Sequence, residues 1–100
     1  MDHLIMTMKY RDRIEIITLM LRSSYADNGS AKTKIMYESF LTFPQLEEYL
    51  SLLLKNDLLV YNAIHRTYKT TEKGLRLLQL SSKLNELLDT RIRQKAMRIP

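Results

Sequence analysis

Residues 31–74, AKTKIMYESFLTFPQLEEYLSLLLKNDLLVYNAIHRTYKTTEKG, carry the signals that decide the fold of this chain. They predict two short helices joined by a tight turn, then a β-hairpin, then the capped start of a long helix. That order of elements is typical of a winged helix-turn-helix, a scaffold used most often to bind nucleic acid. We therefore expect a mainly α-helical fold with a small β-hairpin, followed by a long C-terminal helix.

The second helix of this pair has the clearest start in the sequence. Thr42 is placed to cap it, Pro44 is tolerated in the first turn, and Gln45 completes a capping box. Apolar residues at intervals of three and four give the helix one buried face, and its outer face is polar. The residues expected inside are Leu46, Tyr49, Leu50, Leu53 and Leu54, and those expected outside are Gln45, Glu47, Glu48, Ser51 and Lys55.

The first helix of the pair spans about residues 33–39, with Ser30 or Thr33 as its candidate N-cap and with Ile35 and Met36 turned inward. Upstream, residues 10–24 predict another helix, which is closed by the turn-forming residues 27–30. We also interpret Tyr37, Tyr49 and Tyr68 as packing residues.

Two β-prone runs, residues 58–61 and 66–70, flank a short loop at 62–65 and predict the hairpin, or wing. Thr71 caps the last helix, which begins at Glu72 and runs to about Arg98. At about 1.5 Å per residue, that helix is on the order of 40 Å long, longer than a domain of this size is wide.

The last helix carries apolar residues that one small domain is unable to cover, which favours self-association. We therefore divide the chain into a winged helix-turn-helix domain, residues 9–74, and a C-terminal dimerisation helix, residues 75–98. The expected dimer residues are Leu77, Leu80, Leu84, Leu87, Leu88 and Ile92.

Composition argues against several classes of function. The 100 residues include no cysteine, which excludes disulfides and thiolate metal sites, and His3 and His65 are the only histidines. No nucleophilic triad, glycine-rich phosphate loop or HExxH motif occurs, so we expect neither an enzyme nor a cofactor. No uncharged run is long enough to span a membrane, and the N-terminus lacks the pattern of a signal peptide. We expect a cytoplasmic, nucleoid-associated protein.

The net charge of +5 is unevenly distributed, with the positive excess in residues 61–80 and 91–100. On the predicted fold, Arg66, Lys69 and Lys73 lie at the wing, where they are candidates for contact with DNA phosphates. Lys32 and Lys34 flank a helix N-terminus, which also favours anions. The alternative is that these cations only solubilise the surface.

Three segments, RDRIEIITLML, KTKIMYESFLTFPQLEEYLSLLLKNDLL and TYKTTEKG, resemble the archaeal winged-helix proteins of the Sulfolobus ten-a type. The resemblance covers roughly residues 9–88. It implies a winged helix whose C-terminal helix forms an antiparallel coiled-coil dimer. It also implies regulatory or chromatin-associated binding of double-stranded DNA, without catalysis or a cofactor.

The resemblance also implies a DNA surface on both helices of the pair and on the wing. Lys69 is not implied by the resemblance; we add it because it belongs to the basic cluster of the wing. This chain departs from the family at Phe40, where Asn is usual in the turn, and at Glu47 and Glu48, where small or basic residues are expected. Carboxylates facing phosphates are repelled, which argues against deep docking in the major groove. The implied residues are Lys32, Thr33, Lys34, Thr42, Phe43, Gln45, Ser51, His65 and Arg66.

Two hypotheses follow from these observations. The first is a homodimeric winged-helix DNA-binding protein, either a transcription regulator or a chromatin protein. The alternative is a winged-helix module that binds other proteins through its acidic helix and leucine-rich tail, without binding DNA. Retention on DNA across a salt series separates the two, because phosphate-driven binding falls steeply with salt.

Overall fold

The chain forms four helices and one two-stranded antiparallel sheet within residues 2–98, the order expected of a winged helix-turn-helix. The computed structural model describes the backbone of residues 2–98 and the side chains of residues 13–84 and 86–88. In chain order the elements are α1 (Asp2–Ser23), α2 (Lys32–Glu38), α3 (Phe43–Lys55), β1 (Leu59–Asn62), β2 (Thr67–Thr70) and α4 (Glu72–Arg98).

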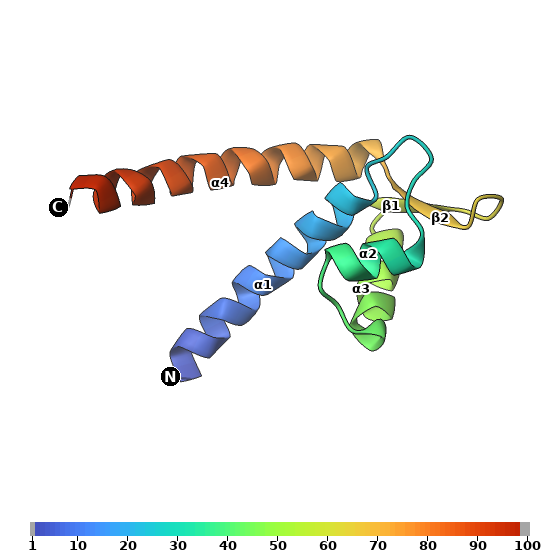
Figure 1. Ribbon diagram of the computed structural model, residues 1–100, viewed down its shortest axis with the longest axis horizontal. Helices are drawn as coiled ribbons and strands as arrows, with labels where there is room; N and C mark the ends of the chain where they lie inside the picture. The colour runs from blue at the N-terminus through green and yellow to red at the C-terminus, as the bar shows by residue number, and fades with distance from the viewer. Residues whose placement is uncertain (1, 99–100) are drawn as a thin grey trace.

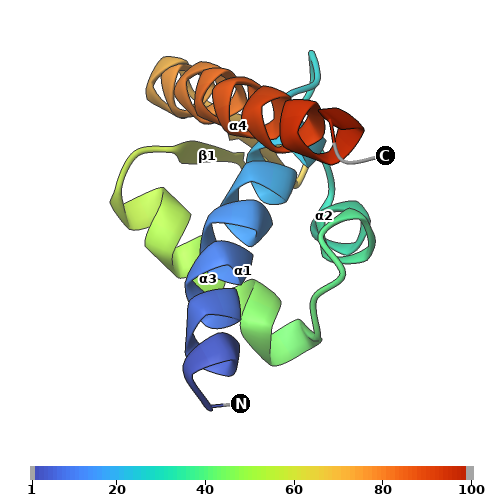
Figure 2. The ribbon, with the colours of Figure 1, turned by 90° about the vertical axis from the view of Figure 1, so that its left-hand side faces the viewer.

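The elements are arranged around the C-terminal half of α1, which packs against α2, α4 and β2. Figure 1 shows the hairpin projecting from one end of the molecule, while α1 and α4 diverge toward the other. Figure 2 shows α4 crossing over the rest of the domain. The radius of gyration is 15.7 Å, against about 13 Å for a compact domain of this length. The excess reflects the helices that extend beyond the core.

The core is one cluster of aliphatic side chains drawn from every helix and from β1. Tyr49 and Tyr68 pack against it, as predicted, and so do Met36 and Leu54. Tyr37 was predicted to pack as well, and this prediction is wrong. Its side chain is 74% exposed, because α2 turns only the neighbouring Ile35 and Met36 toward the core. The buried core residues are Met20, Leu21, Ile35, Leu41, Leu46, Leu50, Leu53, Leu59 and Leu78.

The predicted capping box of α3 is confirmed. The backbone N–H of Gln45 donates to Thr42 Oγ1 at 3.4 Å, and the N–H of Thr42 donates to Gln45 Oε1 at 3.0 Å. Two backbone donors that the helix leaves unpaired are thereby satisfied. The start of α3 is fixed by residues within the helix-turn-helix itself.

The start of α2 differs from the prediction. Its N-cap is Ala31, which makes no side-chain cap, and neither Ser30 nor Thr33 serves that role. Ser30 is instead occupied elsewhere: its backbone pairs with Tyr68 of β2, and its hydroxyl donates to the carbonyl of Ser23. Contacts with Tyr68 and Ser23 therefore prevent Ser30 from serving as the N-cap that its local preference predicts.

The hairpin begins and ends within one residue of its predicted strands, and Leu59 pairs with Thr70 while Asn62 pairs with Thr67. Its base is fastened to the loop after α1. The N–H of Ser30 donates to the Tyr68 carbonyl at 2.9 Å, and the Tyr68 N–H returns a bond of 2.8 Å. Thr67 Oγ1 donates to the carbonyl of Asn28 at 2.7 Å. A two-stranded hairpin alone is marginally stable, so these bonds help to hold the wing in place.

The two long helices, α1 and α4, agree with the prediction at three of their four ends. Helix α4 spans Glu72–Arg98, and the N–H of Gly74 donates to Thr71 Oγ1 at 3.0 Å, which confirms the predicted cap. Helix α1 ends one residue before the predicted boundary but starts at Asp2, eight residues earlier than Tyr10. The intervening sequence has no glycine or proline to interrupt the helix.

Phe40 occupies the turn between α2 and α3 in a strained conformation. Its φ is 55°, in the left-handed region, and its side chain is 85% exposed. A left-handed conformation costs a residue with a Cβ about 1–2 kcal/mol, and asparagine tolerates it better. Since the ring gains little from burial, nothing in its packing offsets the strain.

We therefore expect Phe40→Asn to raise the free energy of unfolding by about 1 kcal/mol, and the melting temperature by roughly 4–8 °C. The matched control is Phe40→Ala, which removes the same ring but lacks the short polar side chain that lets asparagine tolerate the left-handed conformation. Thermal unfolding followed by circular dichroism measures both. Equal melting temperatures for the two variants would show that the backbone of the turn is not the cause.

Candidate nucleic-acid interface

Two surfaces of the domain hold the predicted DNA-binding residues. The first is formed by the N-terminal turns of α2 and α3 together with Ser51 farther along α3, and the second is the wing, residues 59–70. The backbone pairing of Ser30 with Tyr68 fastens the residues just before α2 to β2. The two surfaces are thereby held in a fixed relation to each other.

Lys32 lies where α2 and α3 meet, and its charge is directed at α3. Its Nζ donates to Glu47 Oε1 at 2.6 Å and lies 5.7 Å from the centroid of the Phe43 ring. The hydrogen bond to Glu47 is the main cause that raises the pKa of Lys32, and Tyr61 and Tyr68 add to it. The ammonium group therefore remains charged throughout the physiological range.

The ion pair changes the charge that α3 presents. Glu47 is offset by Lys32, whereas Glu48 is exposed and has no ion-pair partner among the described side chains. The acidic face expected from two adjacent glutamates is thus reduced to one unpaired carboxylate. An exposed pair of this kind contributes only about 0–1 kcal/mol to stability, so its main effect is on the surface charge.

The other predicted residues of this surface are exposed. Thr33 and Lys34 lie on α2, and Ser51 lies on α3. Thr42 and Gln45 are exposed too, but their side-chain oxygens already serve the capping box. Gln45 keeps its amide N–H₂ group as a possible donor to a base edge.

The wing carries its predicted DNA-binding residues at its tip and on β2. His65 and Arg66 are exposed at the tip, and Arg66 adopts a left-handed φ of 53°. Lys69 is exposed on β2, where its Nζ donates to the carbonyl of Asp27 at 2.8 Å. That acceptor is a backbone carbonyl, so this hydrogen bond is not an ion pair.

Lys73 lies apart from the tip, at the start of α4. Its Nζ donates to the carbonyl of Asn56, at the end of α3, at 2.9 Å. The predicted wing cluster is therefore divided between the hairpin, with Arg66 and Lys69, and the junction of α3 with α4.

The candidate dimer residues show a gradient along α4. Leu77 packs partly against the core of its own domain, whereas the predicted leucines from Leu80 onward are exposed. The side chain of Ile92 lies outside the described residues. The exposed members of the predicted set are Leu80, Leu84, Leu87 and Leu88.

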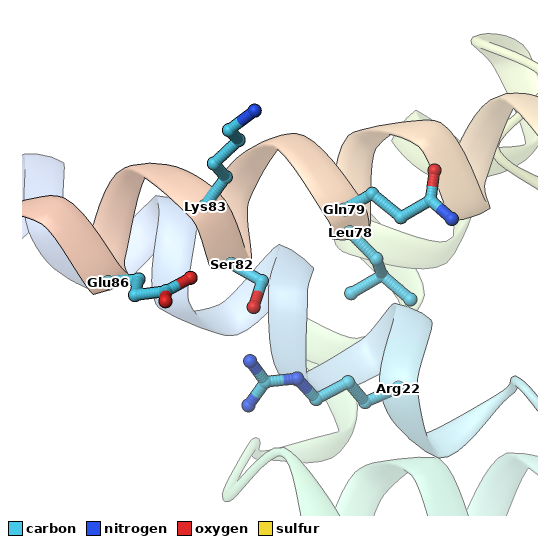
Figure 3. A pocket seen from close by; sticks show the side chains of 6 residues that line it. All are labelled: Arg22, Leu78, Gln79, Ser82, Lys83 and Glu86. Carbon is cyan, nitrogen blue, oxygen red and sulfur yellow. The ribbon is translucent and has the colours of Figure 1, made fainter.

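A shallow depression of about 440 Å³ lies between α1 and α4 (Figure 3). Its lining residues are Arg22, Leu78, Gln79, Ser82, Lys83 and Glu86. Figure 3 shows Arg22 of α1 extending toward the α4 side chains, with Lys83 turned away. Among the described residues, no group of three histidines and acidic residues is placed to hold a metal ion.

Residues 10–89 match the model of a family described as winged helix-turn-helix. The chain belongs to the winged helix-turn-helix family. The match agrees with the order of helices and hairpin in the structure, and α3 takes the position of the recognition helix in this fold. The winged helix-turn-helix is typical of DNA-binding regulators that perform no catalysis. No curated protein matches the chain. Within the described residues, no helix combines the length and apolar character needed to cross a membrane.

Three features of this site were not predicted from the sequence. The carbonyls of Asp27 and Asn28 anchor the wing, Glu47 neutralises Lys32, and Ile64 stands exposed at the wing tip. The first two join residues far apart in the chain. Ile64 was visible as an isolated apolar residue in a predicted turn, a position where burial is not expected.

Proposed function

We propose that this protein is a homodimeric DNA-binding protein, a transcription regulator or chromatin-associated protein of the archaeal Sulfolobus ten-a type. The wing and the N-terminal turns of α2 and α3 contact double-stranded DNA, and α4 joins two copies. In this proposal, residues 9–74 form the DNA-binding domain and residues 75–98 the dimerisation helix. The site of action is the cytoplasmic nucleoid.

The observation that carries the proposal is the basic, anchored wing of a winged helix-turn-helix chain. Arg66 and Lys69 are exposed, and the bonds from Ser30 and Thr67 fix the hairpin to the domain. A preorganised cationic surface contacts phosphates with little ordering cost. Neutralisation of Glu47 by Lys32 removes part of the repulsion between α3 and DNA.

The opposite placement of the wing and α4 supports the dimer. Figure 1 shows the hairpin and the free end of α4 at opposite ends of the molecule. Pairing through α4 therefore leaves both wings free for DNA. The exposed leucines of α4 provide an apolar face for a second copy of the chain.

The test is a salt series on random duplex with Arg66→Gln and Lys69→Gln combined. Glutamine keeps much of each side chain's length and its donor capacity but removes the charge. We expect weaker binding to all sequences. The plot of log affinity against log salt should become shallower by about one unit for each phosphate that the variant no longer neutralises.

The matched control is Lys55→Gln with Lys83→Gln, which removes the same charge from exposed positions on α3 and α4. An equal decrease of slope in the control would mean that net charge, not the wing, determines binding. If the unmodified protein is not retained on duplex even at low salt, the protein-interaction module becomes the better hypothesis.

A further inference from the structure

Ile64, at the tip of the wing, is the most exposed large apolar side chain among those described, at 88%. It lies in the loop between β1 and β2, which Figure 1 shows at the end of the molecule farthest from the C-terminal part of α4. Apolar side chains are rare at the tips of solvated loops, where they gain nothing in the isolated protein. Its side chain is therefore free to contact a ligand.

The loop presents Ile64 in a defined conformation. Asn62 Oδ1 accepts hydrogen bonds from the backbone N–H of Ile64 at 2.9 Å and of His65 at 3.2 Å. Below the loop, the rings of Tyr61 and Tyr68 pack with their centroids 4.8 Å apart. The hairpin base is fastened to the loop after α1, as described above. The tip is thus preorganised, so little conformational entropy is lost when it binds.

The neighbours of Ile64 identify the chemistry of its target. His65 and Arg66 follow it directly and are exposed, and Lys69 lies nearby on β2. An apolar side chain with the basic residues Arg66 and Lys69 on one side matches the DNA minor groove, where phosphates line both edges and the base steps form the floor. A protein pocket would fit the isoleucine but would not account for the adjacent cations.

We propose that Ile64 is a wedge that inserts between base pairs from the minor groove and kinks the duplex. The inference rests on the proposed DNA binding and adds to it a distortion of the DNA. Apolar wedges of this kind partly unstack one base step and bend DNA by about 20–90°. Pyrimidine–purine steps unstack most easily, so TA and CA steps are the preferred sites.

The experiment measures bending and affinity together, with the full chain and a duplex of about 30 base pairs carrying a fluorescent dye at each end. The duplex contains a central TA step. Unmodified protein should bring the two ends closer and raise energy transfer between the dyes. Ile64→Ala should lose at least half of that rise at saturating protein, while Ile64→Leu, which keeps an apolar wedge, should restore it. Val60→Ala, an exposed apolar residue of β1 away from the tip, is the matched control.

The outcomes separate this inference from the proposed function. Binding of duplex without any rise in energy transfer, or an Ile64→Ala protein that bends DNA as well as the unmodified one, would overturn the wedge but not the DNA binding. Absence of duplex binding by the unmodified protein would overturn both. If Ile64→Ala changes the mass of the protein in solution and leaves DNA bending intact, the tip contacts protein and the wedge is wrong.

Discussion

Replacing Leu84 and Leu88 together by lysine should convert the proposed dimer into a monomer. Both leucines are exposed on α4, four residues apart and so on one face of the helix. Complete burial of one leucine contributes about 1.5–3 kcal/mol, so a paired face of this kind can hold two subunits. Light scattering at about 50 µM, where a stable interface is occupied, should give the mass of one chain, 11.9 kDa.

The matched control adds the same two charges elsewhere on α4, as Gln79→Lys with Ser82→Lys. Figure 3 shows these residues on the part of α4 that lines the depression with Arg22. The control should remain a dimer. The monomeric variant should also bind DNA about 100-fold more weakly, because two linked domains bind through a high effective concentration. If the unmodified protein is itself a monomer at this concentration, the proposed dimer is wrong.

The sequence predicted those parts of the fold that depend on neighbouring residues. The capping box at Thr42 and Gln45 lies within four residues, and its geometry was predicted correctly. The buried face of α3 followed from the spacing of its leucines. Thr71 was predicted as a cap from its position before Glu72, and the structure confirms it.

Contacts between distant residues were not predictable in the same way. Ser30 has a high preference for the N-cap position, yet its pairing with Tyr68, 38 residues later, removes it from that role. Tyr37 has a large aromatic side chain of the kind often found in a core. Because α2 is short and buries Ile35, the side chain of Tyr37 is turned toward solvent. For Ser30, a tertiary contact overrode the local preference. For Tyr37, the packing of α2 decided which of its faces is buried.

In the candidate site, too, local features were predictable from the sequence and contacts between distant residues were not. Exposed cations on the wing were predictable, because a hairpin with alternating side chains must expose some of them. The ion pair of Lys32 with Glu47 joins residues 15 positions apart, so the sequence showed both charges without their pairing. The charge on α3 was therefore overestimated. The roles of individual residues in binding DNA remain predictions.

Gly74→Ala is expected to be the most destabilising single substitution proposed, and it acts through the junction that supports the wing. A Cβ at Gly74 would lie 2.4 Å from the carbonyl oxygen of Leu58 and 2.7 Å from Thr70 Cγ2. Leu58 immediately precedes β1, and Thr70 ends β2. The added methyl group therefore has to push α4 away from both ends of the hairpin.

Two effects of opposite sign compete at this position. Alanine favours a helix over glycine by about 1 kcal/mol, whereas overpacking a tight contact costs typically 1–3 kcal/mol and more against backbone. Since the closest atom is a backbone oxygen, we expect the clash to dominate. The net loss should be about 2 kcal/mol, with a melting temperature lower by roughly 10 °C.

Thermal unfolding at one fixed protein concentration measures this change, with Ser82→Ala as the control. Ser82 is exposed on the same helix, so its replacement by alanine improves helix preference without meeting a neighbour. The control should melt at the same temperature as the unmodified protein or slightly higher. Because the added Cβ would meet the residue before β1 and the last residue of β2, Gly74→Ala should also weaken DNA binding at temperatures where the domain is still folded. If Gly74→Ala instead raises the melting temperature, α4 is not packed this closely against the hairpin, and the wing does not depend on this junction for its position.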